Sequence, residues 1–380
     1  MVKKINTRKL GVVLIGFVSF ILICGGGALL LFFFHGTSAV VPKTAAQSEP
    51  LQTPTPTLAP LYDPLNGEIL SATQYAALKN NMPLAVMMPN DVDARPWQSG
   101  INNADVVYEA LTEGPVTRFM AIFYADQDNF KVMPVRSTRV YFLDWLLEYN
   151  NIIIAHTGYA QTTNPLTNAY AILKDDNVRS LVWDFPFTYD NTCANSTTTP
   201  VWDCAYSTTQ RLWNDAEQKH GWTASQWTGL PTSLQWEYKS DAPVATPTAS
   251  TITIPFLYKN DAWQTTWKYD PTNNDYLRFD YQDKPQMDHL SNTQINTKDL
   301  VVQEVPFQQT HDEKDRSIQG VIGQGKAYIF EDGNEVQGTW KKASQTAKTF
   351  FYDANGNEIQ FNRGREWISV IPDTQTITVK

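Results

Sequence analysis

The sequence predicts an α+β fold: an N-terminal mixed α/β layer domain, residues 62–240, followed by a mostly antiparallel β domain, residues 241–380. In the first half, short apolar runs of strand length alternate with segments whose apolar residues have helical spacing. In the second half, Asp-Gly and Asn-Gly pairs separate runs rich in β-branched and aromatic residues, which is typical of hairpins. Residues 10–34 contain no charged side chain, so one transmembrane helix is predicted in front of both domains.

The N-terminal charges predict how that helix is oriented. Residues 1–34 contain no acid, and four cations precede the apolar segment: Lys3, Lys4, Arg8 and Lys9. By the positive-inside rule, residues 1–9 form a cytoplasmic tail. The bulk of the chain is then extracytoplasmic, in a single-pass protein of the cell membrane whose partner is the lipid bilayer. A cleavable signal peptide is the alternative, but its apolar region is usually shorter, about 7–15 residues.

Cys24 lies inside the apolar segment and raises the alternative of a lipid anchor. A lipid-acceptor cysteine normally follows a small residue, whereas Ile23 precedes Cys24, and the apolar run continues beyond it. A membrane-buried thiol is therefore favoured over a lipidated one. Residues 35–61 follow and are rich in proline and threonine, a composition that predicts an extended stalk.

Apolar periodicity defines the elements of the N-terminal domain. Strands are predicted at 83–88, 105–111, 118–124 and 152–155, and helices at 139–149, 164–173 and 207–221. The helix at 164–173 is expected to begin at the cap and first-turn pair Asn164-Pro165. The last helix has a capping box that starts at Ser207, and Gly221 closes it. Residues 242–250 include two prolines and are the expected joint between the domains.

Turn residues define the elements of the C-terminal domain. A first strand at 251–254 is followed by a hairpin over 263–281 that is broken at 271–274. Two further hairpins are centred on Asp332-Gly333 and Asn355-Gly356. These dipeptides are strong hairpin signals because both central residues of the turn need positive φ.

Cys193 and Cys204 are the only cysteines outside the apolar segment. In an oxidising compartment, two cysteines this close in sequence can close a loop, so a disulfide is the favoured interpretation. Two unrelated free thiols are the alternative.

Composition and motifs exclude several classes of function. The chain has 42% hydrophobic and 18% charged residues, which excludes wholesale disorder. Its net charge of −9, which becomes −13 without the four N-terminal cations, opposes nucleic-acid binding because phosphate recognition needs a basic surface. The sequence contains no zinc-type or nucleophile-elbow motif, so neither a metal nor another cofactor is expected.

Charged residues concentrate in the first half and form the candidate site. Arginines in front of a predicted helix can hold a carboxylate or phosphate through forked hydrogen bonds. The candidate ligand-binding residues are Arg118, Arg136, Arg139, Asp105 and Asp144. The candidates for catalysis are Glu109 and Glu113 as acid/base groups and His156 as a base at a strand end. The alternative is that the arginines pair with these carboxylates inside the domain, as a structural network, and that the histidine is a satisfied strand-end residue.

Tryptophans form a second concentration, since six of the twelve fall between residues 183 and 236. Exposed tryptophan and tyrosine faces stack on sugar rings or peptides, whereas most tryptophan side chains are largely buried. Core packing is therefore the favoured interpretation, and a ligand-stacking surface is the alternative.

The sequence resembles the YerB-like bacterial lipoproteins in short motifs spread over about residues 62–372. These motifs lie at 83–87, 95–100, 104–111, 113–114, 117–119, 134–139, 156–158, 325–328 and 337–341. The resemblance implies a bacterial envelope protein whose biochemical function is not established. The family usually has a lipobox, whereas this chain has the pattern of an uncleaved anchor. Where the family tends to have Pro-His-Asn-x-Tyr, this chain has Trp202-Asp203-Cys204-Ala205-Tyr206, which weakens an enzymatic interpretation.

Three functions are consistent with these observations. The first is a membrane-anchored extracytoplasmic protein that binds a cell-envelope or extracellular ligand, such as an envelope glycan or peptide. The second is a hydrolase or transferase that acts on an envelope polymer, and the third is a scaffold or assembly protein without a ligand site. One open, solvent-reached pocket around Glu109, Glu113, Arg136, Arg139 and His156 would support the first two functions. Burial and mutual pairing of these residues would contradict both and leave the third.

Overall fold

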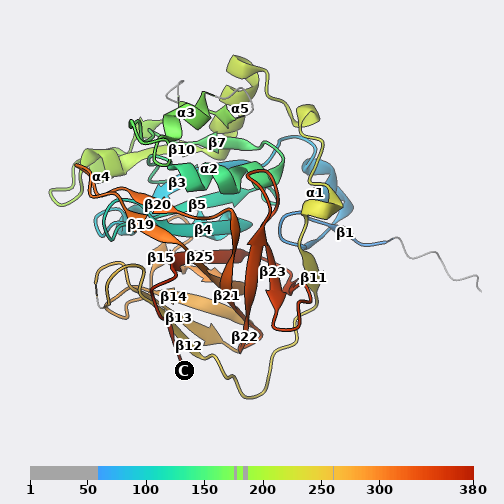
Figure 1. The fold of residues 1–380 in the computed structure, drawn as a ribbon. Coiled ribbons are helices and arrows are strands. Elements are labelled where there is room, and N and C mark those ends of the chain that lie inside the picture. The colour runs from blue at the N-terminus through green and yellow to red at the C-terminus, as the bar shows by residue number, and fades with distance from the viewer. Residues whose placement is uncertain (1–58, 175–177, 183–186, 260) are drawn as a thin grey trace, which may run out of the picture. The chain divides into compact units, whose positions relative to one another are not determined.

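The computed structural model describes residues 59–380, except 175–177, 183–186 and 260 (Figure 1). The predicted cytoplasmic tail, the predicted transmembrane helix at 10–34 and nearly all of the predicted stalk lie outside these residues. Within the described part of the chain, no helix is long and apolar enough to cross a membrane. Leu58–Lys380 forms one compact unit.

A ten-stranded mixed sheet is built from both halves of the sequence (Figure 1). The N-terminal half contributes β4 (Val106–Leu111), β5 (Thr117–Phe123), β3 (Leu84–Pro89), β7 (Ile153–Ala155) and β8 (Arg179–Ser180), adjacent in that order. The C-terminal half contributes β25 (Glu366–Pro372), β18 (Asp299–Val305), β21 (Gly323–Glu331), β22 (Asn334–Lys342) and β23 (Phe350–Asp353), again in order of adjacency.

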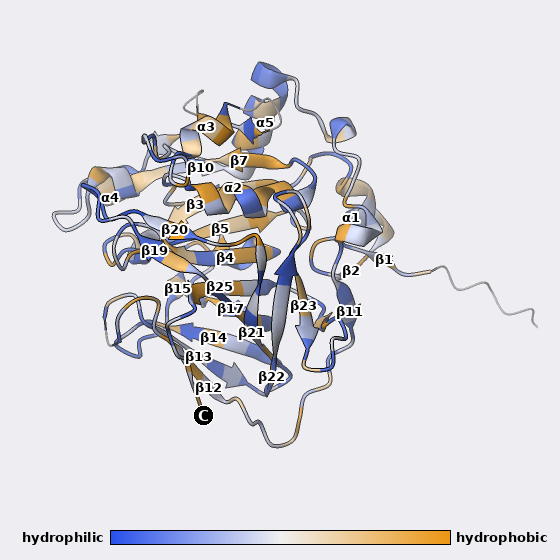
Figure 2. Ribbon diagram, in the orientation of Figure 1, coloured by the Kyte–Doolittle hydropathy of each residue, from blue (hydrophilic) through white to orange (hydrophobic). Residues whose placement is uncertain are grey.

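The two halves of this sheet meet where β25 pairs with β4 in parallel, with Trp367 opposite Val107. Every residue of β3, β4, β5, β18 and β25 is buried. Strands that are covered on both faces have near-continuous apolar sequences, which is why the sequence pattern identified them. Figure 2 shows this apolar concentration in β3, β4 and β7 and in the neighbouring helix α2 (Val140–Leu146).

The helices are short and lie mostly in the first half. They are α1 (Ala72–Ala77), α2, α3 (Ala169–Leu173), α4 (Asn191–Ala194) and α5 (Thr209–His220), with 3-10 turns at Arg95–Trp97, Ile101–Asn103, Leu147–Tyr149, Val201–Cys204, Ala224–Gln226 and Thr232–Leu234. Helix α2 packs on the large sheet, where Trp145 stacks on Tyr108 with ring centroids 5.0 Å apart.

Two expected helix starts differ from the structure. The helix expected from Asn164 begins only at Ala169, because Asn164 caps a local turn through its side chain, which accepts from the backbone N–H of Leu166. Helix α5 is capped by Thr208, whose hydroxyl accepts from the backbone N–H of Arg211, while Ser207 belongs to the preceding strand. Gly221 closes α5 at φ 69°, as the sequence predicts.

A second sheet of five strands packs against the large one, with Trp267 against Trp367 at 5.0 Å between ring centroids. In order of adjacency, its strands are β17 (Asn296–Thr297), β14 (Asp275–Phe279), β13 (Thr265–Asp270), β12 (Thr251–Ile254) and β26 (Thr378–Val379). The remaining strands form small sheets: β1 (Leu61–Tyr62) with β2 (Ile69–Leu70), β10 (Ala205–Thr208) with β6 (Lys131–Val132) and β9 (Thr188–Tyr189), β11 (Glu237–Lys239) with β24 (Gln360–Asn362), β15 (Met287–Asp288) with β16 (Thr293–Gln294), and β19 (Phe307–Gln309) with β20 (Ser317–Gln319).

The hairpin predictions have mixed outcomes. Asp332 and Gly333 both have positive φ and join β21 to β22, as the dipeptide predicts. The strand after Asn355-Gly356 pairs with β11 in parallel instead of with β23, and only one bridge, Tyr352 to Glu358, remains of the expected hairpin.

Candidate functional site

Glu113 brings together two of the candidate ligand-binding arginines. Its Oε2 accepts a hydrogen bond from Nη2 of Arg118 at 3.0 Å, and its Oε1 accepts from Nε of Arg139 at 2.6 Å. Arg118 also donates to the backbone oxygen of Ser137, and Arg139 donates to that of Thr138. Burial, reinforced by the charge of Arg139, lowers the pKa of Arg118 to about 9. Burial opposes the charged form of Glu113, but the two arginines outweigh it and lower the pKa of Glu113.

Arg136 lies beside a different carboxylate. Its Nε is 3.2 Å from Oδ1 of Asp203, whose side chain is buried. Burial is the main cause that raises the pKa of Asp203 to about 6, with Asp91 adding to the rise and Arg136 opposing it. Asp203 lies in the stretch Trp202–Tyr206, for which the resemblance leads us to expect Pro-His-Asn-x-Tyr. All three candidate arginines therefore face carboxylates of the protein itself, which is the structural network that the sequence analysis held as the alternative.

Glu109 has a partner other than these arginines. It forms a bidentate ion pair with Arg278 of β14, both N–O distances being 2.8 Å, and both side chains are fully buried. Asn90, Thr117 and Trp367 also donate to its carboxylate. This carboxylate is saturated and out of reach of solvent, and Arg278 was not among the residues that the sequence analysis selected.

His156 is fully buried at the end of β7. Its Nδ1 lies 2.7 Å from the backbone oxygen of Gly158 and its Nε2 lies 2.9 Å from Oγ of Ser180. Burial lowers the pKa of His156 to about 4, so the ring is neutral at pH 7. Both ring nitrogens are occupied by the protein, as in a satisfied strand-end histidine.

The two candidate aspartates also have protein partners. Asp105 accepts hydrogen bonds from the side chain of Asn66 and from the backbone N–H of Tyr124, and burial raises its pKa well above the ordinary value. Asp144 accepts from Nε2 of Gln345 at 2.9 Å, and burial raises its pKa too. The structure therefore does not gather the eight selected residues around one pocket.

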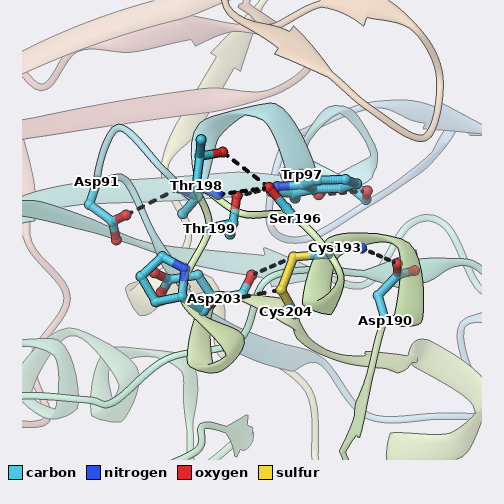
Figure 3. The surroundings of a disulfide bond; sticks show 12 residues. Asp91, Trp97, Asp190, Cys193, Ser196, Thr198, Thr199, Asp203 and Cys204 are labelled. Carbon is cyan, nitrogen blue, oxygen red and sulfur yellow. Dashed lines mark hydrogen bonds between the residues drawn. A yellow bond between two sulfur atoms is a disulfide. The ribbon is translucent and has the colours of Figure 1, made fainter.

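Cys193 and Cys204 are joined by a disulfide, with Cα atoms 5.5 Å apart (Figure 3). The bond ties α4 to the 3-10 turn that carries Asp203, the residue directly before Cys204. Trp97 packs beside this loop and donates from Nε1 to Oγ1 of Thr199 at 3.1 Å. The disulfide thus fixes the backbone that presents Asp203 to Arg136.

An open cavity of about 800 Å³ lies away from the arginines and is lined by aromatic rings; we call it the aromatic cavity. It is lined by Pro60, Leu61, Tyr62, Pro64, Tyr75, Leu78, Lys79, Asn81, Tyr124, Ala224, Ser225, Trp227, Thr228, Gly229, Leu230 and Gln235. Tyr124 and Trp227 meet edge to face at 5.0 Å, and Nε1 of Trp227 donates to the backbone oxygen of Tyr149, which orients the indole. Tyr62 and Tyr75 are 42% and 36% exposed, and each ring has a protein cation over one face, Arg363 at 5.3 Å and Lys79 at 5.9 Å from the ring centroid.

A second open cavity of about 480 Å³ also borders α1, at Gln74 and Ala77, and we call it the polar cavity. Its lining includes Glu68, Asp105, Asp126 and Asp128, with Arg365 as the cation. Helix α1 itself contains no buried residue. Of the candidate site residues, Asp105 lines the polar cavity, and Trp227 of the tryptophan-rich segment lines the aromatic cavity.

Metal-binding groups do not converge anywhere in the described part of the chain, where no set of three or more His, Cys, Asp or Glu side chains could hold an ion.

Comparison with known proteins places the chain in a class whose biochemical role is open. Two domain models described as a protein of unknown function (DUF3048) match it, the N-terminal one over residues 70–223 and the C-terminal one over residues 252–368. The chain therefore belongs to the DUF3048 family and has its two domains, a mixed-sheet N-terminal domain and a β-rich C-terminal domain.

The chain is similar to a protein of Bacillus subtilis (strain 168) whose descriptive name is "Putative lipoprotein YerB". The two sequences are 27% identical over 301 residues, which cover 78% of this chain and 83% of YerB. The crystal structure of Bacillus subtilis YerB has the same fold, with a TM-score of 0.68 and 22% sequence identity over 84% of this chain and 99% of that one. The chain is thus a distant homologue of YerB, and this relationship is consistent with an envelope protein.

Proposed function

We propose that this protein is a membrane-anchored extracytoplasmic binding protein that holds an envelope glycan or peptide in the aromatic cavity. The observation that carries the proposal is the convergence of four aromatic rings, Tyr62, Tyr75, Tyr124 and Trp227, on one open cavity of about 800 Å³. Aromatic faces with polar groups at the rim suit ligands that have both an apolar and a hydrogen-bonding side, as sugars and peptides do.

The polar groups of the rim support this ligand class. Lys79, Asn81 and Gln235 line the cavity together with the hydroxyl groups of Ser225 and Thr228. These groups offer donors and acceptors around the rings without a strong net charge. A neutral or weakly charged polymer segment fits this chemistry better than a polyanion.

The test is cosedimentation of the full chain, in detergent, with purified insoluble peptidoglycan. The wild type is expected to bind, and the Y62A/Y75A double variant is expected to bind about tenfold more weakly, the loss of roughly 1.4 kcal/mol of stacking. Tyr258 is 55% exposed and does not line the cavity, so Y258A is the matched control and should bind like the wild type.

The same experiment separates the alternatives. Release of soluble fragments would identify a hydrolase or transferase that acts on the polymer, the second function. Equal binding by the wild type and the double variant, or no binding at all, would contradict the proposed cavity and leave the scaffold function. The saturated environments of Glu109 and His156 count against both catalysis and ligand binding at the residues selected from the sequence, so the proposal rests on the aromatic cavity alone.

A further inference from the structure

Lys239 and Asn362 lie directly opposite each other in the small parallel sheet of β11 and β24. Nζ of Lys239 donates a hydrogen bond to Oδ1 of Asn362 at 2.7 Å. A primary amine is therefore held against the carbonyl group of a side-chain amide, on two strands whose register is fixed by backbone pairing. The residues are 123 positions apart in the sequence, so only the fold brings them together.

Asp332 accepts hydrogen bonds from both the amine of Lys239 and the side-chain amide of Asn362. Its Oδ2 accepts from Nζ of Lys239 at 2.6 Å, and its Oδ1 accepts from Nδ2 of Asn362 at 3.1 Å. Asn274 and the backbone N–H of Ala242 also donate to Oδ1, which fixes the carboxylate in place. The carboxylate of Asp332 thus contacts both Nζ of Lys239 and Nδ2 of Asn362.

The amide is buried and held rigidly. Asn362 and Asp299 are fully buried, and Asp299 accepts from both the backbone N–H and Nδ2 of Asn362, at 2.6 Å and 2.9 Å. On the neighbouring positions, Phe361 pairs with Tyr238 in the register and meets Trp236 at 5.2 Å between ring centroids, which anchors the two strands to the core. The burial of Asn362 keeps bulk water, a competing nucleophile, away from its Cγ, whereas the side chain of Lys239 is 25% exposed.

We propose that Lys239 and Asn362 form an intramolecular isopeptide bond, with Asp332 as the group that transfers the proton. Oδ2 of Asp332 first takes one proton from the ammonium of Lys239, and the lone pair that this frees on Nζ attacks Cγ of Asn362. In the tetrahedral intermediate Asp332 delivers that proton to Nδ2, the bond from Cγ to Nδ2 breaks, and ammonia leaves. The second proton that Nζ must lose then passes through the same carboxylate to the ammonia, which becomes an ammonium ion. A lysine ammonium and an asparagine amide become one secondary amide and one ammonium ion, so atoms and charge balance without an oxidant or cofactor.

The resting state is the ion pair. Burial opposes the charge of Lys239, but Asp332 and Glu331 outweigh it and raise the pKa of Lys239. The free amine is reached only when a proton moves along the short hydrogen bond to Asp332. Because the reaction turns over once in the life of the molecule, a small population of free amine suffices, and proximity supplies the rate.

The test is mass spectrometry of tryptic peptides from the full chain, digested after denaturation. A cross-link blocks cleavage after Lys239 and produces one branched peptide composed of residues 220–259 and 349–363. Its mass should be lower than the sum of the two peptides by one ammonia molecule. Recovery of both peptides only in unlinked form would overturn the proposal.

Variants test each participant. K239R and N362A should yield no branched peptide, and N362D should yield the same branched peptide through loss of water. D332N keeps both reacting residues and tolerates the turn, and it should form at least tenfold less cross-link. An undiminished yield in D332N would contradict the role of Asp332. K268R is the matched control, because Lys268 pairs with Asp283 and no side-chain amide is bonded to it.

Discussion

At the scale of residues, the carboxylates, arginines and histidine that the sequence indicated are satisfied by protein groups. The pairing of Glu113 with Arg118 and Arg139 could be anticipated, because these residues flank predicted strand and helix ends in the same domain. The partner of Glu109 could not be anticipated, because Arg278 lies 169 positions away on a strand of the other domain. The pattern of charges in the sequence therefore identified candidate residues. Whether each one pairs with a protein group or faces solvent depends on its burial, which only the fold reveals.

His156 makes the stability of the protein depend on pH in a defined window. Its pKa is about 4 in the folded state, against about 6.5 in an unfolded chain, so the unfolded state binds more protons between these values. The free energy of unfolding should therefore fall as the pH drops from about 6.5 to about 4, by up to about 3 kcal/mol from this residue. Urea denaturation of the wild type and of H156N over this range measures the difference.

The control for this prediction is H311Q, since the side chain of His311 is 80% exposed. H311Q should keep the pH dependence of the wild type, whereas H156N should have a flatter curve. Identical curves for H156N and the wild type would show that His156 takes up its proton with little penalty.

At the scale of elements, buried strands were predicted to within one or two residues because their apolar runs are continuous. Helix α3 starts later than expected because Asn164 caps a local turn, and α5 starts later because Ser207 pairs with Val132 of β6 as part of strand β10. Strand partners were the least predictable feature. The parallel pairings of β18 with β25, of β25 with β4 and of β11 with β24 have no local signal, since parallel strands are not joined by a tight turn.

Gly338 of β22 lies very close to the edge strand β23, so a substitution at this position tests their packing. A Cβ at this position would lie 1.9 Å from the backbone oxygen of Tyr352, so G338A should separate β23 from β22. We expect a loss of about 1–3 kcal/mol and faster hydrogen exchange of the amides in β23. In contrast, a Cβ on Gly221 meets nothing within 4 Å, so G221A should cost only about 1 kcal/mol of backbone strain and leave β23 unchanged. Equal exchange of β23 in both variants would contradict this packing.

At the scale of the whole molecule, the two family domains share one sheet and buried ion pairs, among them Glu109 with Arg278 and Glu148 with Lys342. The sequence predicted two domains with a joint at 242–250, and the family models cover two domains, but neither indicates that β25 and β4 are neighbours. A change in composition along the chain shows where one domain gives way to the next. It does not show which sheet edges of the two domains pair with each other.

Arg278 should therefore stabilise the entire body. R278M leaves the carboxylate of Glu109 buried without its cation, and we expect a loss of about 3–5 kcal/mol in a single unfolding transition monitored by chemical denaturation. The double variant E109M/R278M should recover much of this loss, because an apolar pair has no charge to desolvate. K268M, which breaks an exposed pair with Asp283, should cost less than about 1 kcal/mol. Two separate transitions in R278M would indicate that the domains unfold independently.

Because the shared sheet pairs a strand from each half of the sequence, it cannot form until the C-terminal half has been synthesised. About 255 residues separate the end of β4 from the start of β25, the strand that covers its edge. At a translation rate of roughly 5–20 residues per second, this edge of β4 stays unpaired for on the order of 10–50 s. Exposed strand edges recruit other chains, so the nascent protein is most vulnerable to aggregation during this interval. A factor that shields the N-terminal half until Glu366–Pro372 emerges would raise the yield of folded protein more than one that acts afterwards.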